Sequence, residues 1–205
     1  MVFVAFVIAH SGALNMVAGH ERAHRRSLIH KICGDLVYAK FMYPHFIIQH
    51  VKSHHKKVAT PEDPSSARKG ESVFYFWWRA IPAGYVEVWE MESQRLSKEG
   101  KSAFSLYNKL VLWNLICVTY CVSLWFVLGN KALAFHLLQS MFGILLFEAI
   151  NFIEHYGLER KLDANGNYES INIKHSWNAP QVMSNYMFFK LQRHSDHHAN
   201  AYKPY

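Results

Sequence analysis

Apolar runs dominate the pattern of hydrophobic and polar positions along this chain. Residues 110–128 carry no charge, and their length of 19 residues is close to the roughly 20 that a helix needs to cross a bilayer. A polar turn at 129–131 ends this run, and residues 132–153 form a second apolar stretch. Residues 1–18 form a shorter run with a few polar interruptions. The pattern predicts three transmembrane helices, at 1–18, 110–128 and 132–153, with the last two paired as a hairpin.

The remaining segments are more polar. Residues 27–57 alternate apolar and basic positions, which predicts helices near a membrane surface, and residues 60–72 form a polar loop rich in Pro and Gly. Asn165-Gly166 is a typical β-hairpin turn between residues 159–162 and 168–173. We therefore expect one all-α, integral-membrane helical bundle over residues 1–205, with a small β-hairpin insertion.

The distribution of charge predicts how this bundle is oriented. Lys and Arg exceed Asp and Glu by 22 to 15, which gives a net charge of +7. Residues 22–57 hold eight basic residues against a single acidic one, Asp35. Cytoplasmic loops are enriched in Lys and Arg, so the first span is expected to end on the cytoplasmic side near His20, with residues 21–109 and the segment from 154 onward on that side. The chain has no motif of a nucleic-acid reader, so the basic charge does not indicate nucleic acid.

Histidine is the anomaly of the composition, with 14 copies. Nine of them fall in four clusters, all predicted on the same side of the membrane: His20 and His24; His50, His54 and His55; His155; and His194, His197 and His198. Residues three or four apart share one face of a helix, so each multiple cluster can aim two or more imidazoles at one point. Adjacent pairs such as His54-His55 diverge and can serve two metals.

Nine imidazoles are too many for one tetrahedral zinc ion, and they suit two metal ions with open positions. Imidazole binds iron, zinc, copper or nickel, so ligand type alone does not select the metal. Three carboxylates beside the clusters are candidates to orient ligand imidazoles: Glu21, Glu154 and Asp196.

Two other functions fit part of this pattern. The segment "HERAH" matches the H-E-x-x-H pattern of zinc proteases, in which Glu21 would be the general base, but seven further clustered histidines have no role there. A metal-transporting membrane protein would instead have histidines distributed through its spans, where only His10 and His136 lie.

Several longer motifs resemble the membrane alkane 1-monooxygenases, also called alkane omega-hydroxylases, which are related to the membrane fatty-acid desaturases and hydroxylases. The motifs are "GHERAHRR", "QHVKSHHKKVATPEDPSSARKGES", "NFIEHYGL" and "LQRHSDHHA". They occur in the family's order and cover nearly the whole chain. Two positions depart from the family's second box, where Gln49 replaces the usual Glu and Ser53 the usual Gly. Gln49 is therefore a further candidate contact of the metal ligands.

The resemblance implies two iron ions held by the nine clustered histidines, with no catalytic residue beyond these ligands. It implies insertion of one oxygen atom of O2 into the terminal C–H bond of a medium- or long-chain alkane. Family members receive electrons from rubredoxin and rubredoxin reductase. A related fatty-acid desaturase or fatty-acyl hydroxylase is the alternative. Family members also have helices before the first box and a segment after the last, so we expect this chain to be a fragment.

Overall fold

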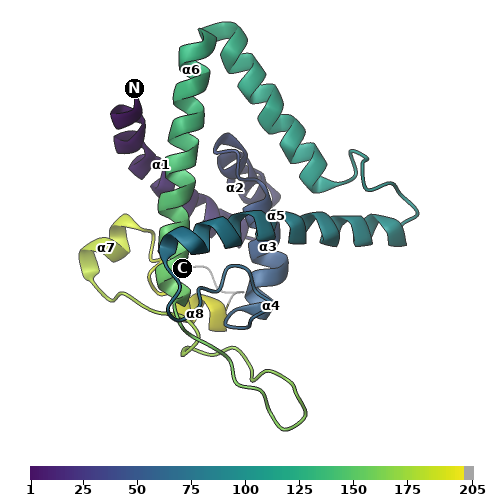
Figure 1. Cartoon of the computed structure of the whole chain (residues 1–205), viewed down its shortest axis with the longest axis vertical. Coiled ribbons are helices and arrows are strands. Elements are labelled where there is room, and N and C mark those ends of the chain that lie inside the picture. Colours follow the sequence, from purple (N-terminus) through teal and green to yellow (C-terminus); the bar gives the residue numbers. More distant parts are fainter. Residues whose placement is uncertain (201–205) are drawn as a thin grey trace.

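All regular elements in the computed structural model, which describes residues 1–200, are helices (Figure 1). They are α1 (Val2–Ala23), α2 (Leu28–Lys40), α3 (His45–Gln49), the π-helix η1 (His50–His54), α4 (His55–Lys57), α5 (Val73–Lys98), α6 (Lys109–His155), α7 (Val182–Met187) and α8 (His194–Ala199). The predicted helical class is confirmed for these residues.

Helix α6 folds back on itself at Gly129, where φ is 80° and ψ is −178°. Glycine adopts this backbone conformation without the steric cost that a Cβ atom would add. The two arms form the long hairpin in Figure 1, and the second arm packs along α1. The break lies within the polar turn at 129–131 that interrupts the apolar pattern.

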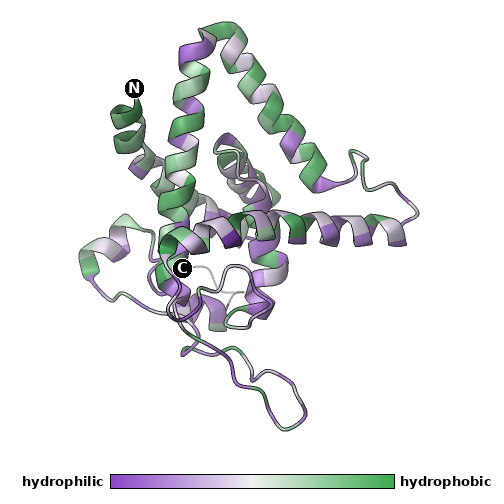
Figure 2. Ribbon diagram, in the orientation of Figure 1, coloured by the Kyte–Doolittle hydropathy of each residue, from purple (hydrophilic) through white to green (hydrophobic). Residues whose placement is uncertain are grey.

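Both α1 and α6 are long and apolar enough to cross a bilayer. Large apolar side chains near the fold of the hairpin are strongly exposed, including Phe126 (82%) and Val127 (77%). Contiguous apolar surface of this kind requires lipid or another protein to cover it. Figure 2 shows the hairpin and α1 largely apolar, while polar residues gather around α4 and α8.

Close packing of α1 against its neighbours depends on small residues. A Cβ atom on Gly12 would lie 2.7 Å from Cε1 of Phe41, so only glycine fits there without a shift of that ring. Phe41 belongs to a core that also contains Tyr38 and Phe147, and the hydroxyl of Tyr38 donates to the carbonyl of Met16 at 2.8 Å. This core fixes α1, α2 and α6 relative to one another.

The loop of residues 58–72, which we call the 58–72 loop, connects α4 to α5 and packs on the end of α6. Gly157 N donates to the carbonyl of Ala67 at 2.9 Å, and Arg160 N donates to that of Ala59 at 2.7 Å. At the far end of the loop, the Ser72 hydroxyl caps α5 by accepting from Tyr75 N. The loop is therefore tied to the chain immediately after α6.

The predicted β-hairpin insertion is wrong. The turn forms, with Gly166 at φ 79° and the Asp163 carboxylate accepting from two backbone amides, but only one isolated bridge, between Leu162 and Tyr168, flanks it. Two short strands are marginal unless they pack an apolar face on something else. Residues 161–170 are mostly polar and exposed, so residues 1–200 contain the turn but no strand.

Candidate metal centre

Four histidines from distant parts of the chain form a first histidine set: His20, His24, His50 and His197. One ring nitrogen of each lies within 4.8 Å of the others. The closest pair is His20 Nε2 and His50 Nε2, at 2.6 Å. His20 lies in the last turn of α1, His24 directly follows that helix, and His50 and His197 lie in η1 and α8. The set therefore exists only because these elements pack together.

A second histidine set lies next to the first and consists of His54, His155, His194 and His198. All four side chains are buried. Nε2 of His194 lies 3.1 Å from Nε2 of His155 and 3.0 Å from Nε2 of His198. The other ring nitrogen of His155, Nδ1, lies 3.4 Å from the Ser176 hydroxyl.

His55 lies between the two sets. Its Nε2 atom is 3.0 Å from that of His50 and 3.1 Å from that of His197, both in the first set. Its ring centroid is also 4.6 Å from that of His198 in the second set. The structure thus brings together all nine histidines of the sequence clusters.

The π-helix η1 decides which histidines share a set. A π-helix closes its hydrogen bonds over five residues, so positions i and i+5 lie near one another. His50 and His55 meet in this way, whereas His54 turns to the second set. An α-helix would instead place His50 and His54, four residues apart, on one face, so the assignment of His54 to the second set differs from what α-helical spacing predicts.

Hydrogen bonds between imidazoles do not account for these short contacts. His50 Nε2 lies 2.6 Å from His20 Nε2 and 3.0 Å from His55 Nε2, yet a neutral ring nitrogen either donates one hydrogen or accepts through one lone pair. Two nitrogens bound at about 2.1 Å to one ion, at a right angle, lie about 3 Å apart. The donor set therefore fits a pair of metal ions.

Burial holds the histidines in the form that binds metals. Desolvation, together with the charge of His54, lowers the pKa of His24 to about 4. Burial, followed by the neighbouring imidazoles, places the pKa of five other histidines well below the usual value: His50, His55, His194, His197 and His198. Neutral imidazole has the free lone pair that a metal requires.

The four candidate orienting residues occupy different places. Glu154 is buried, and its Oε2 lies 3.5 Å from His194 Nε2, the nitrogen turned toward the other imidazoles. Glu21 pairs with Arg25 at 2.6 Å. Asp196 lies on the exposed side of α8 and accepts from Asn200. Glu154 therefore lies beside a nitrogen of the second histidine set.

Gln49 and Ser53, the two departures from the family pattern, contact the same carboxylate, that of Glu87 on α5. Gln49 Nε2 donates to Glu87 at 3.2 Å, and the Ser53 hydroxyl donates at 2.6 Å. Lys57 also binds this carboxylate, at 2.6 Å. Gln49 Nε2 lies 3.5 Å from Oδ1 of Asp63 as well, so its amide lies between two acidic side chains.

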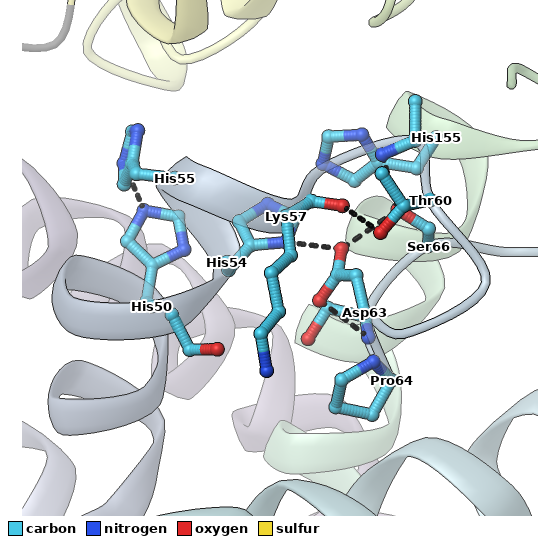
Figure 3. Close-up of polar contacts among 12 residues, drawn as sticks. His50, His54, His55, Lys57, Thr60, Asp63, Pro64, Ser66 and His155 are labelled. Carbon is cyan, nitrogen blue, oxygen red and sulfur yellow. Dashed lines mark hydrogen bonds and ion pairs between the residues drawn. The ribbon is translucent and has the colours of Figure 1, made fainter. Parts of the chain in front are cut away.

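Asp63 is the residue of the site that the sequence analysis missed. Its carboxylate is 1% exposed and lies 2.7 Å from Nδ1 of His54, as Figure 3 shows. Burial alone would raise the pKa of Asp63, but the neighbouring His54 and hydrogen bonds from His54 and Ser66 lower it below the usual value. An acidic residue between two prolines, eight positions after a His-His pair, was the available signal.

Comparison with known proteins extends this picture to the whole chain. The family model described as "Fatty acid desaturase" matches residues 1–205. Alkane 1-monooxygenase 1 of Pseudomonas aeruginosa is 40% identical over 95% of this chain and 51% of its own length. Alkane 1-monooxygenase 1 of Alcanivorax borkumensis is 43% identical over 94% of this chain and 47% of its own length.

A more distant relative is the xylene/toluene monooxygenase hydroxylase component of Pseudomonas putida, at 28% identity over 94% of this chain and 51% of its own length. The chain spans about half the length of the curated relatives it matches. The resemblance drawn from the motifs is confirmed by these matches. The chain belongs to the fatty acid desaturase family.

Proposed function

We propose that this chain forms the metal-binding part of a membrane alkane 1-monooxygenase. The reaction inserts one oxygen atom of O2 into the terminal C–H bond of a medium- or long-chain alkane. Two electrons and two protons reduce the other oxygen atom to water. The observation that carries the proposal is the meeting of nine imidazoles in two adjoining sets. The names of the similar proteins supply the substrate class.

Two iron ions are the proposed cofactor, held by the first and second histidine sets with His55 between them. When bound, iron supplies the O2 chemistry that no amino-acid side chain can provide. The protein supplies nine neutral ligands. Nine neutral imidazoles leave the charge of both ions uncompensated, so the buried carboxylate of Glu154 and that of Asp63 behind His54 have an electrostatic role.

A small cavity beside the histidines has both polar and apolar walls. His20, His50 and His194 line it on one side, and Phe46, Phe147 and Ile150 contribute apolar walls. In the proposed reaction, these apolar side chains would limit the access of water to the space beside the ions. Asn151, Glu154 and Leu191 complete the lining, so one acidic group faces this space.

We further propose that α1 and both arms of α6 cross the membrane as a multi-pass bundle within a single domain, with the histidines at its cytoplasmic side. The apolar surface of these helices and the basic residues between 22 and 57 support this orientation. Rubredoxin and its reductase are the proposed electron source. A net charge of +7 favours the approach of an acidic carrier by electrostatic steering.

Product analysis tests this proposal. The chain would be expressed in bacterial membranes that lack alkane oxidation, together with rubredoxin and rubredoxin reductase, and supplied with a panel of alkanes and fatty acids. We expect primary alcohols from alkanes, labelled from ¹⁸O2, and none from the His197→Ala variant. An iron-loaded chain that forms no alcohol from any alkane would contradict the proposed activity.

A fatty-acid desaturase or fatty-acyl hydroxylase is the second candidate, because the matching family model describes desaturases. The same panel separates the two, since a double bond or a hydroxylated acyl chain would identify the second. A transport function would place histidines through the spans, and a protease would leave seven clustered histidines unused. The gathering of nine imidazoles supports neither of these.

A further inference from the structure

The 58–72 loop places a carboxylate directly behind one ligand of the second histidine set. Oδ2 of Asp63 lies 2.7 Å from Nδ1 of His54, and both side chains are fully buried (Figure 3). We propose that Asp63 is a positioning residue, which fixes the ring orientation and tautomer of His54 so that Nε2 faces the metal. This inference rests on the proposed metal function of the histidine sets.

The hydrogen-bonding chemistry leaves one arrangement. An ionised carboxylate only accepts, so Nδ1 of His54 must carry the hydrogen and donate it to Asp63. Nε2 then keeps its lone pair. Within residues 1–200 this Nε2 atom is buried and has no hydrogen-bond partner, while the ring lies 4.7 Å from that of His155 and 4.8 Å from that of His198. A buried lone pair among three other imidazoles is the arrangement that a metal ion satisfies.

Asp63 is itself held by groups that do not belong to the histidine sets. The Ser66 hydroxyl donates to Oδ2 at 2.7 Å, and the backbone N–H of Ser65 donates to Oδ1 at 3.1 Å. Gln49 Nε2 lies 3.5 Å from Oδ1. These donors fix both carboxylate oxygens. The position of the loop therefore determines where the carboxylate holds the ring of His54.

The same loop is fastened beside another ligand of the second set. Ala67 and Ala59 accept from Gly157 and Arg160, which follow His155 within five residues. The 58–72 loop therefore joins the chain after η1 to the chain after α6. Through Asp63 it sets the distance between two ligands that are about a hundred residues apart in the sequence.

Metal binding tests the inference without relying on turnover. The full chain would be purified from membranes, stripped of metal, and titrated anaerobically with Fe²⁺ in competition with a chelator. For Asp63→Asn we expect the affinity for the more weakly bound Fe²⁺ ion to fall about 10- to 100-fold. A loss of this size is typical when a ligand histidine loses its carboxylate partner. Asp63→Ala should lose at least as much, and Asp63→Glu should restore part of it.

A matched control is Asp163→Asn, which replaces a loop carboxylate that also binds backbone amides but is fully exposed in the 163–167 turn. It should bind both ions as the original chain does. The thermal midpoint of the metal-free protein separates positioning from plain folding, since positioning predicts nearly equal midpoints for Asp63→Asn and the original chain. X-ray absorption at the iron edge should report fewer imidazole ligands per iron in the variant.

Four outcomes are decisive. Selective weakening of one ion with an unchanged metal-free midpoint supports the inference. The inference is overturned if Asp63→Asn binds both ions as the original chain does. It is also overturned if the variant binds both ions equally more weakly and has a lower metal-free midpoint. Failure of the original chain to bind two Fe²⁺ ions would instead contradict the proposed function.

Discussion

His50 and His55 are five residues apart, and their Nε2 atoms lie 3.0 Å from each other. In an α-helix, residues five apart point about 140° away from each other, because each residue turns about 100°. In the π-helix η1, which closes its hydrogen bonds over five residues, this angle is much smaller, so both rings point to the same place. A local departure from α-helical geometry therefore decides how ligands are shared between the two sets.

This relationship predicts separable losses of metal. His197→Ala should remove the ion of the first histidine set and His155→Ala that of the second, so each should about halve the bound iron and abolish turnover. Iron per chain would be measured by mass spectrometry on the purified protein. His136→Ala is the control, since this buried histidine packs on Tyr120 away from both sets. Full iron and full turnover in either ligand variant would refute that ligand assignment.

Glu154→Gln tests the proposed charge compensation. The carboxylate lies 3.5 Å from His194 Nε2, so neutralising it leaves the nearby ion with less compensating charge. We expect Fe²⁺ affinity at the second set to fall about tenfold, while affinity at the first set changes less. The chelator titration reports both. The control is Glu99→Gln, which alters a partly exposed carboxylate paired with Arg95 and Lys101 and should leave both affinities nearly unchanged.

The shared carboxylate of Glu87 predicts a coupled pair of substitutions. Gln49→Glu would place a third acidic group against Glu87 and Asp63, where the amide now donates to both, and should cost about 1–3 kcal/mol. Glu87→Gln in the same chain should recover part of that loss, because an amide then faces the new carboxylate and one of its two repulsive contacts is removed. Thermal midpoints of the single and double variants would reveal the coupling. Strictly additive midpoints would contradict this account.

Glu92 predicts a loss of stability in acid. Burial would raise its pKa, but hydrogen bonds from Arg95, Lys52 and the Lys109 backbone outweigh burial and lower the pKa to about 2. Since the pKa in the folded state lies below that of the unfolded chain, the stabilisation is complete above about pH 4.5 and is lost as pH falls toward 2.

The expected size of this effect is about 2–3 kcal/mol. Glu92→Gln should therefore lower the thermal midpoint at pH 7 and flatten its dependence on pH between about 5 and 2.5. The control is Glu99→Gln, which alters a partly exposed carboxylate paired with Arg95 and Lys101. It should change the midpoint little. An unchanged pH profile in Glu92→Gln would argue against the network.

Much of the fold follows from features that sequence displays directly. The uncharged run at 110–128 and the polar turn at 129–131 predict a helical hairpin. A membrane-spanning helix needs a long apolar run, and the reversal of the chain needs a residue such as Gly129. The strands around Asn165-Gly166 failed to form, since a turn signal says nothing about partners for the flanking segments.

The site was only partly readable from the sequence. Clustered histidines identify the residues that meet, but the π-helix has no comparable local signature, so the division into sets required the structure. Asp63 was overlooked because proline-rich polar segments usually mark solvent-exposed loops. Its burial arises from contacts with residues 157 and 160, which are distant in the sequence.

The histidine sets have a consequence for how the protein matures. Each set unites a ligand from the first 54 residues with one from positions 194–198, so a nascent chain lacking α8 offers neither set in complete form. Ribosomes add about 5–20 residues per second, which leaves the early histidines without their late partners for roughly 7 to 35 seconds. Iron delivered during that interval would meet only partial sites, and stable capture would wait until α8 has emerged and docked.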